Sequence, residues 1–115
     1  MTEQTPFYEL GQFLSAYFNQ DWMHIKIRPD WTPENADAES VVRYFIDQSP
    51  PELLNTVAQD IDELLAVGMS EEELQQFLYA KLGSYYMPTA DGVSPSDWLR
   101  SVRELFLSAA ERTPL

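Results

Sequence analysis

The chain has 115 residues, enough for one domain with a hydrophobic core and too few for two. Hydrophobic residues make up 44% of it and aromatic residues 13%, which is typical of a folded globular protein and excludes a disordered one. The formal net charge of −12 opposes binding to nucleic acid and to anionic membranes, and the absence of cysteine excludes disulfides and thiolate metal sites.

A first helix is predicted from Pro6 to Phe18. Thr5 can cap this helix, and Pro6 takes the first helical position, where its missing N–H costs nothing. Apolar side chains then recur at steps of three and four residues, which indicates one buried face. The members of this face are Phe7, Leu10, Phe13, Leu14, Tyr17 and Phe18.

Residues 23–28 alternate between apolar and polar side chains, a pattern typical of a strand. The chain offers no second strand to pair with this one, so we expect an extended segment that packs Met23, Ile25 and Ile27 on the core. The same alternation could add a strand to a partner or to a second copy. Pro29 and Pro33 bracket the next stretch as a loop.

Four more helices follow in the pattern. The second helix is expected to begin at Thr32–Pro33 or at Asn35. The third is expected to begin at Ser49, which can act as a cap before Pro50. Gly68 is expected to end the third helix in a left-handed conformation. The remaining signals are a capping box at Ser70 to Glu73, a stop at Gly83 and a helix start at Ser94–Pro95. These patterns predict an all-α fold, a bundle of about five helices that forms a single domain over residues 1–115.

Acidic residues are concentrated in the middle of the chain. Residues 29–80 contain twelve acids and one base, Arg43, so this stretch carries −11 of the net −12. We expect a negative face on the third and fourth helices that either attracts a basic partner or serves solubility alone. Its candidate partner-contacting members are Asp60, Asp62, Glu63, Glu71, Glu72 and Glu73.

Catalytic and metal-binding patterns are missing from the sequence. His24 is the only imidazole, and no serine lies in an elbow motif that would pair with it. The four glycines are scattered and form no phosphate loop, and Asp60, Asp62 and Glu63 lack the looped pattern that calcium needs. We therefore expect a binding protein without catalytic residues, cofactor or metal. No signal peptide or apolar segment of about 20 residues is visible, which favours the cytoplasm.

Aromatic residues gather where two predicted helices end. Tryptophan and tyrosine at such junctions usually fill the core while their polar atoms find partners. We therefore interpret these motifs, with their polar neighbours, as part of the scaffold rather than as a direct ligand contact. The predicted structural residues are Gln20, Asp21, Trp22, Tyr85, Tyr86, Pro88 and Trp98.

Between Phe7 and Leu107 the sequence contains several short blocks whose order matches that of a known protein family. They are Tyr17–Trp22 (YFNQDW), Ser70–Leu74 (SEEEL), Leu82–Pro88 (LGSYYMP), Asp91–Gly92 and Trp98–Leu99. In these blocks the chain resembles bacterial immunity proteins of contact-dependent growth inhibition systems. It departs from that pattern at Asn19, where the family more often has histidine, and at Ser84, where it more often has cysteine. Residues 23–38 also form a longer link than is usual there.

The resemblance implies a cytoplasmic protein that binds and neutralises the C-terminal domain of a cognate toxin, in a stoichiometric complex. Many such toxin domains are nucleases with basic substrate grooves, and an acidic inhibitor can occupy such a groove. We expect the free protein to be a monomer. An acidic helical adaptor without a toxic target is the alternative that the residues alone leave open.

Overall fold

A computed structural model describes residues 7–24 and 27–112 of the chain. In chain order the elements are α1 (Tyr8–Tyr17), the 3-10 helix η1 (Trp22–His24), α2 (Ala38–Asp47), α3 (Pro51–Ala66), α4 (Glu71–Ala80), the 3-10 helix η2 (Pro88–Asp91) and α5 (Pro95–Arg112). No strand occurs in these two ranges. The prediction of an all-α fold with about five helices is confirmed.

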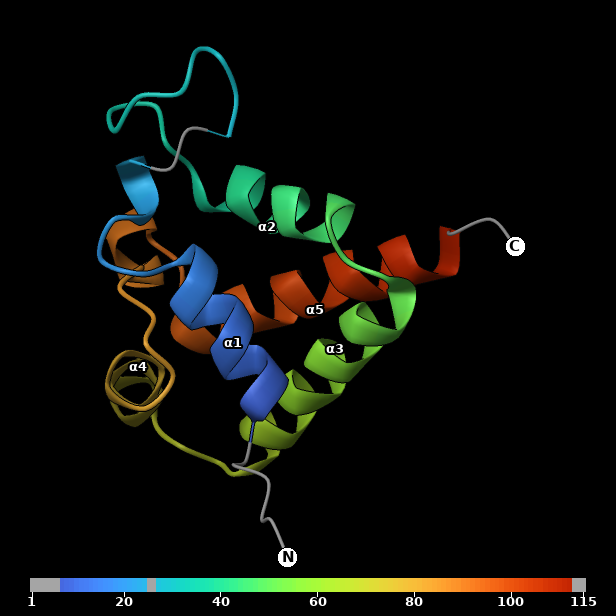
Figure 1. Cartoon of the computed structure of the whole chain (residues 1–115). Helices are drawn as coiled ribbons and strands as arrows, with labels where there is room; N and C mark the ends of the chain where they lie inside the picture. The colour runs from blue at the N-terminus through green and yellow to red at the C-terminus, as the bar shows by residue number, and fades with distance from the viewer. Residues whose placement is uncertain (1–6, 25–26, 113–115) are drawn as a thin grey trace, which may run out of the picture.

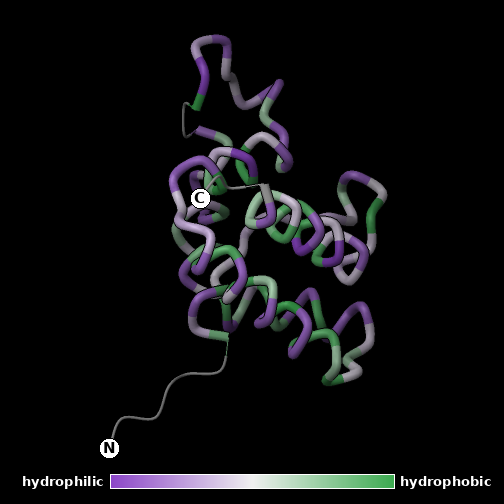
Figure 2. Tube along the Cα trace, turned by 90° about the vertical axis from the view of Figure 1, so that its right-hand side faces the viewer, coloured by the Kyte–Doolittle hydropathy of each residue, from purple (hydrophilic) through white to green (hydrophobic). Residues whose placement is uncertain are grey.

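The C-terminal helix α5 is the element around which the others are arranged. It packs most extensively against α3 and also contacts α2, α4 and η2, while α1 packs against α3 and α2. In Figure 1, α5 runs across the middle of the molecule with α2 above it and α3 below. Figure 2 shows apolar and polar residues interleaved along the helices, as expected when each helix buries one face.

Two connected groups of aromatic rings lie at the centre of the core. Phe13 of α1 contacts both Phe45 of α2 and Phe106 of α5, with ring centroids 4.5 Å and 5.4 Å away. Phe18, which follows α1, also contacts Phe13 and connects it to the second group. Phe18 meets Trp22, Tyr86 and Trp98 at 5.6, 5.6 and 5.3 Å. The junctions that follow α1 and α4 are therefore packed against the start of α5.

Of the helix starts, that of α1 differs most from the one predicted from the sequence. This helix begins at Tyr8, because Phe7 before it has a left-handed conformation with φ of 62°. The predicted cap Thr5 and first residue Pro6 lie outside the described residues. No neighbouring side chain among the described residues caps α1, and the carboxylate of Asp60 on α3 accepts a hydrogen bond of 3.1 Å from the Leu10 N–H.

The starts of α2 and α3 also differ from the prediction. α2 begins at Ala38, after the predicted starts at Thr32–Pro33 or Asn35, because the Asp37 carboxylate caps it by accepting from the Ser40 N–H at 2.7 Å. Asn35 instead folds back on its own loop, where its side-chain oxygen accepts from the Thr32 N–H. The hydroxyl of Ser49 donates to the Phe45 carbonyl at the end of α2, so it does not cap α3.

Other helix ends agree with the prediction from the sequence. Ser70 and Glu73 form the predicted capping box of α4, with reciprocal hydrogen bonds of 2.9 and 3.1 Å. Gly68 and Gly83 follow α3 and α4 with φ of 85° and 76°, in the left-handed region where glycine is favoured. Pro95 takes the first position of α5 as predicted.

The expectation of an extended segment at residues 23–28 is wrong where the structure describes it. The chain turns into η1, with hydrogen bonds from the Trp22 N–H to the Asn19 carbonyl and from the His24 N–H to the Asp21 carbonyl. A 3-10 turn does not alternate its side chains, so Met23 points outward and is 40% exposed. Ile27 does pack against the core, and Ile25 lies outside the described residues.

Candidate functional site

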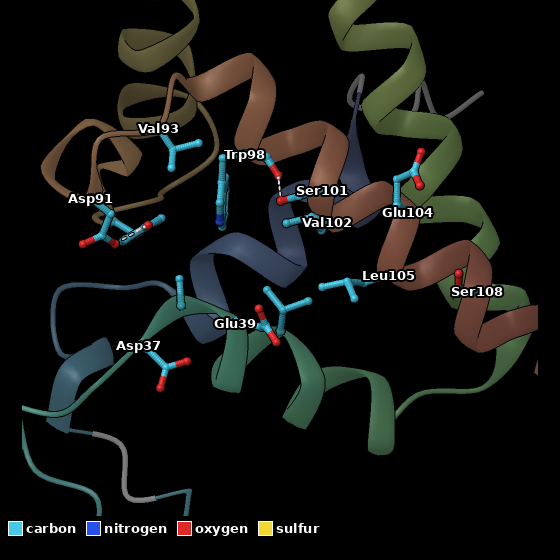
Figure 3. Close-up of a pocket in the computed structure, with 13 residues that line it drawn as sticks. Asp37, Glu39, Asp91, Val93, Trp98, Ser101, Val102, Glu104, Leu105 and Ser108 are labelled. Atoms are coloured by element: carbon cyan, nitrogen blue, oxygen red, sulfur yellow. Dashed lines mark hydrogen bonds between the residues drawn. The ribbon is translucent and has the colours of Figure 1, made fainter.

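A groove of about 800 Å³ lies between α2 and α5. Figure 3 shows α2 below and α5 above, with the loop that carries Asp91 and Val93 closing one end. Its floor is apolar and combines side chains from both helices and that loop. The apolar lining residues are Ala38, Val42, Val93, Trp98, Val102 and Leu105.

Four carboxylates stand at the edge of this groove. Asp37 caps α2, Glu39 lies in the first turn of α2, Asp91 ends η2, and Glu104 comes from α5. They differ in their partners. Glu39 pairs with Arg43 on its own helix at 2.9 Å. Glu104 has neither an ion pair nor a side-chain hydrogen bond within the described part of the chain. We call these four residues the acidic rim.

Asp37 has the most contacts in the acidic rim. Its carboxylate accepts from both the N–H and the hydroxyl of Ser40 and lies 3.5 Å from Arg28. Partial burial acts to raise the pKa of Asp37, but the Ser40 hydrogen bonds and the Arg28 charge outweigh it and lower the pKa below its usual value. Asp37 is therefore held in its charged form at the start of α2.

Asp91 is held by a tyrosine at the end of the groove. The Tyr86 hydroxyl donates to an Asp91 carboxylate oxygen at 2.6 Å. Burial, followed by this hydrogen bond and the Asp91 charge, raises the pKa of Tyr86 well above its usual range. Tyr86 is therefore a neutral donor at physiological pH, and the charge of Asp91 has no basic side chain paired with it among the described residues.

Trp98 forms part of the groove floor and is only 6% exposed. Its ring packs against Phe18 and Tyr86 at 5.3 and 5.1 Å. No hydrogen bond from its indole Nε1–H is found to any described residue, whereas the indole of Trp31 donates to the Met23 carbonyl at 3.0 Å. Figure 3 shows the Trp98 ring edge-on, with its nitrogen at the end nearer α2 in that view.

The described residues offer no constellation that points to metal chemistry. No group of three or more histidine, cysteine, aspartate or glutamate side chains within residues 7–24 and 27–112 could hold a metal ion. The search for a helix long and apolar enough to cross a membrane, over the same residues, found none. What the site offers instead is an apolar floor with negative edges, which suits the binding of another molecule.

Comparison with known families identifies the chain. The family model of the CdiI immunity protein matches residues 6–106, which is most of the sequence. The chain belongs to the CdiI immunity protein family. Neither a curated protein nor a solved structure matches it. As a family member, the chain acts in toxin neutralisation by binding a cognate toxin protein.

Four of the six acids singled out from the sequence bond to other groups within this CdiI family member. Asp60 faces the start of α1, where it accepts from the Leu10 N–H. Glu71 faces the start of α5, where its two carboxylate oxygens accept from the N–H and the hydroxyl of Ser96 at 3.0 and 2.7 Å. Both side chains therefore stabilise the N-terminus of a neighbouring helix, a role that sequence periodicity cannot reveal.

Two more of these acids are bound within the protein and two are free. Asp62 forms an ion pair of 2.5 Å with Arg103 of α5, and Glu73 completes the capping box of α4. Glu63 and Glu72 are exposed and show no side-chain hydrogen bond or ion pair to any described residue. Of the six, only these two have carboxylates that are wholly available to a partner.

The residues of the aromatic motifs divide into a buried and an exposed set. Trp22, Tyr86, Pro88 and Trp98 are buried, and all but Pro88 belong to the aromatic group around Phe18. Gln20 and Asp21 are exposed, and Tyr85 is 45% exposed, with its ring against Tyr79. The backbone N–H of Tyr85 still joins the two junctions, because it donates to the Phe18 carbonyl at 2.7 Å.

The acidic rim was not predicted from the sequence as a set. Its members come from α2, η2 and α5, far apart in the chain, and only the fold brings them to one groove. One usable signal was present. Asp37 stands directly before the apolar pattern of α2 and has serine three residues later, as a helix cap would.

Proposed function

We propose that this chain neutralises the C-terminal toxin domain of a cognate contact-dependent growth inhibition protein, and that this domain is a nuclease with a basic substrate groove. The observation that carries the proposal is the charge of −11 on residues 29–80 in a member of an immunity protein family. A nuclease must attract phosphates, so its groove is basic, and an acidic protein can compete for that groove. We further propose that the protein works in the cytoplasm as a free monomer with one domain.

Charge in such a complex acts mainly on the rate of association. A single-sign field steers a basic partner and raises the association rate constant more than it raises affinity. All six acids of α3 and α4 contribute to this field, including those that are bound within the protein. Glu63 and Glu72 are the two that can be neutralised without removing an internal contact.

The first test is rescue of growth. The cognate toxin domain is expressed alone and together with this protein, and survival is scored. We expect this protein to restore growth and to co-purify with the toxin domain at a one-to-one ratio. An unrescued culture and the absence of a complex would reject the proposal and favour an acidic adaptor without a toxic target.

The second test concerns the nuclease assignment and the role of charge. The association rate constant is measured for the parent protein and for Glu63→Gln with Glu72→Gln, at about 0.05 M and about 0.5 M salt. We expect slower association for the variant at low salt and a smaller difference at high salt, where screening is strong. A toxin domain that degrades no nucleic acid, or association that ignores salt, contradicts this part of the proposal.

A further inference from the structure

We propose that the groove between α2 and α5 is the surface that holds the toxin domain. The occupant is a basic segment of that domain, which places an apolar side chain on the groove floor and a backbone carbonyl against the Trp98 indole. This inference rests on the proposed function, because it assigns the site of the same interaction. It is separable from that function, since the protein can neutralise a toxin through another surface.

The shape of the groove suits one inserted segment. Its volume of about 800 Å³ lies within the usual range for binding pockets. Val42, Trp98 and Val102 form a well-packed floor with 1%, 6% and 1% exposure, so the site is rigid before a partner arrives. Val93 and Leu105 are only partly buried at its sides. Apolar contact with these two side chains removes further surface from water.

The acidic rim determines the charge of the occupant. Arg28 and Arg43 partly offset Asp37 and Glu39, but Asp91 and Glu104 have no basic partner among the described residues. A segment with lysine or arginine on both sides of an apolar residue complements this arrangement. A second copy of this chain does not fit as well, because it would bring another net charge of −12 to an acidic groove.

Trp98 adds a polar requirement that is independent of charge. The Trp98 indole N–H bonds no described residue, and its nitrogen is not among the fully buried polar atoms that lack a partner, so it reaches the groove surface and can donate to an occupant. A backbone carbonyl of an extended segment is the acceptor that any peptide provides. The groove therefore combines an apolar floor, negative edges and one free donor, which together match a basic peptide segment.

The first experiment compares two exposed glutamates that carry the same charge. Affinity for the toxin domain is measured for Glu104→Lys at the rim and for Glu63→Lys on α3, neither of which has an internal partner. Both variants change the charge by two units, so the effect of the long-range field is similar in both. We expect Glu104→Lys to weaken binding about tenfold more than Glu63→Lys, in line with a contact charge. Equal losses would overturn the assignment.

A second pair of variants blocks the groove without changing charge. Ser108 lines the groove, is exposed and makes no side-chain hydrogen bond within the described chain. We expect Ser108→Trp to weaken binding at least about tenfold while Ser108→Ala leaves it within about twofold, with unfolding midpoints unchanged. Full binding by Ser108→Trp would overturn the proposal.

The indole resonances provide a direct readout of the predicted hydrogen bond. The protein has three tryptophans, and in Trp31 the N–H is already bound to the Met23 carbonyl. On titration with the toxin domain, we expect the Trp98 indole proton to shift and to exchange more slowly with water, while that of Trp31 stays in place. If the parent protein binds and the Trp98 resonance does not move, the groove assignment fails and the proposed function stands. If the parent does not bind, the proposed function itself fails.

Discussion

At the scale of single residues, a carboxylate of one helix caps another helix. Asp60 of α3 accepts from the Leu10 N–H in the first turn of α1, where Phe7 at the cap position makes no side-chain hydrogen bond to the helix. We expect Asp60→Ala to lower the free energy of unfolding by about 1 kcal/mol, the usual cost of a lost N-terminal cap. Glu63→Ala on the same helix is the control, with an expected change within about 0.5 kcal/mol. Urea denaturation measures both, and equal effects would show that Asp60 is not a cap.

Trp22 is a second residue whose role can be measured. It is 8% exposed and its ring contacts Phe18 and Tyr86, at 5.6 and 5.4 Å. We expect Trp22→Ala to lower the free energy of unfolding by about 3–5 kcal/mol, because a large cavity replaces the ring. The exposed neighbour provides the control Met23→Ala, which should have little effect. Normal stability of Trp22→Ala with lost toxin binding would identify Trp22 as a contact residue instead.

At the scale of elements, the start of α2 should respond to pH. The pKa of Asp37 is lowered in the folded state, so its stabilisation is complete above the unfolded pKa of about 4 and is lost as pH falls through the folded pKa. Asp37→Ala should therefore cost about 1 kcal/mol at pH 7 and progressively less below about pH 4. Asp30→Ala, which removes a contact with Arg28 but no cap, is the control. A cost for Asp37→Ala that does not change with pH would contradict this.

The ends of α3 and α4 differ in the space around their glycines. Gly68 and Gly83 both have positive φ, but a Cβ on Gly68 meets nothing within 4 Å, whereas one on Gly83 would lie 3.0 Å from the Ser15 Cβ of α1. Gly68→Ala should cost about 1–2 kcal/mol through backbone strain alone. Gly83→Ala should cost more, because α1 must also shift. Thermal unfolding of both variants gives the order, and a larger loss for Gly68→Ala would contradict the prediction.

The buried faces of the helices could be predicted from the sequence, and several helix starts could not. Periodicity identifies Leu54, Val57, Ile61 and Leu64 as buried because one face of a helix repeats every three to four residues. The residue at which a helix starts depends on which side chain accepts hydrogen bonds from the free N–H groups of its first turn. At Ser70 that side chain is local in sequence and was identified, but at α1 it is Asp60, fifty residues away.

At the scale of the whole molecule, the groove depends on packing between distant segments. Periodicity marked Val42, Trp98 and Val102 as buried side chains, and only the position of α2 against α5 leaves space above them. The acids that the sequence made prominent are consecutive or nearly so, and three of the six bond to the start of a helix. The acidic rim draws one or two members from each of three elements, so no local pattern in the sequence distinguishes it.

The dominance of α5 in the core has a consequence for synthesis on the ribosome. α3 packs mainly against α5, yet its last residue, Ala66, is made 46 residues before Arg112 completes that partner. At a synthesis rate of about 5–20 residues per second, roughly 2–9 s pass before α5 is complete. During this time only α1 is available to pack against part of the apolar face of α3. Only a finished chain therefore has the complete core that supports binding of a cognate toxin protein.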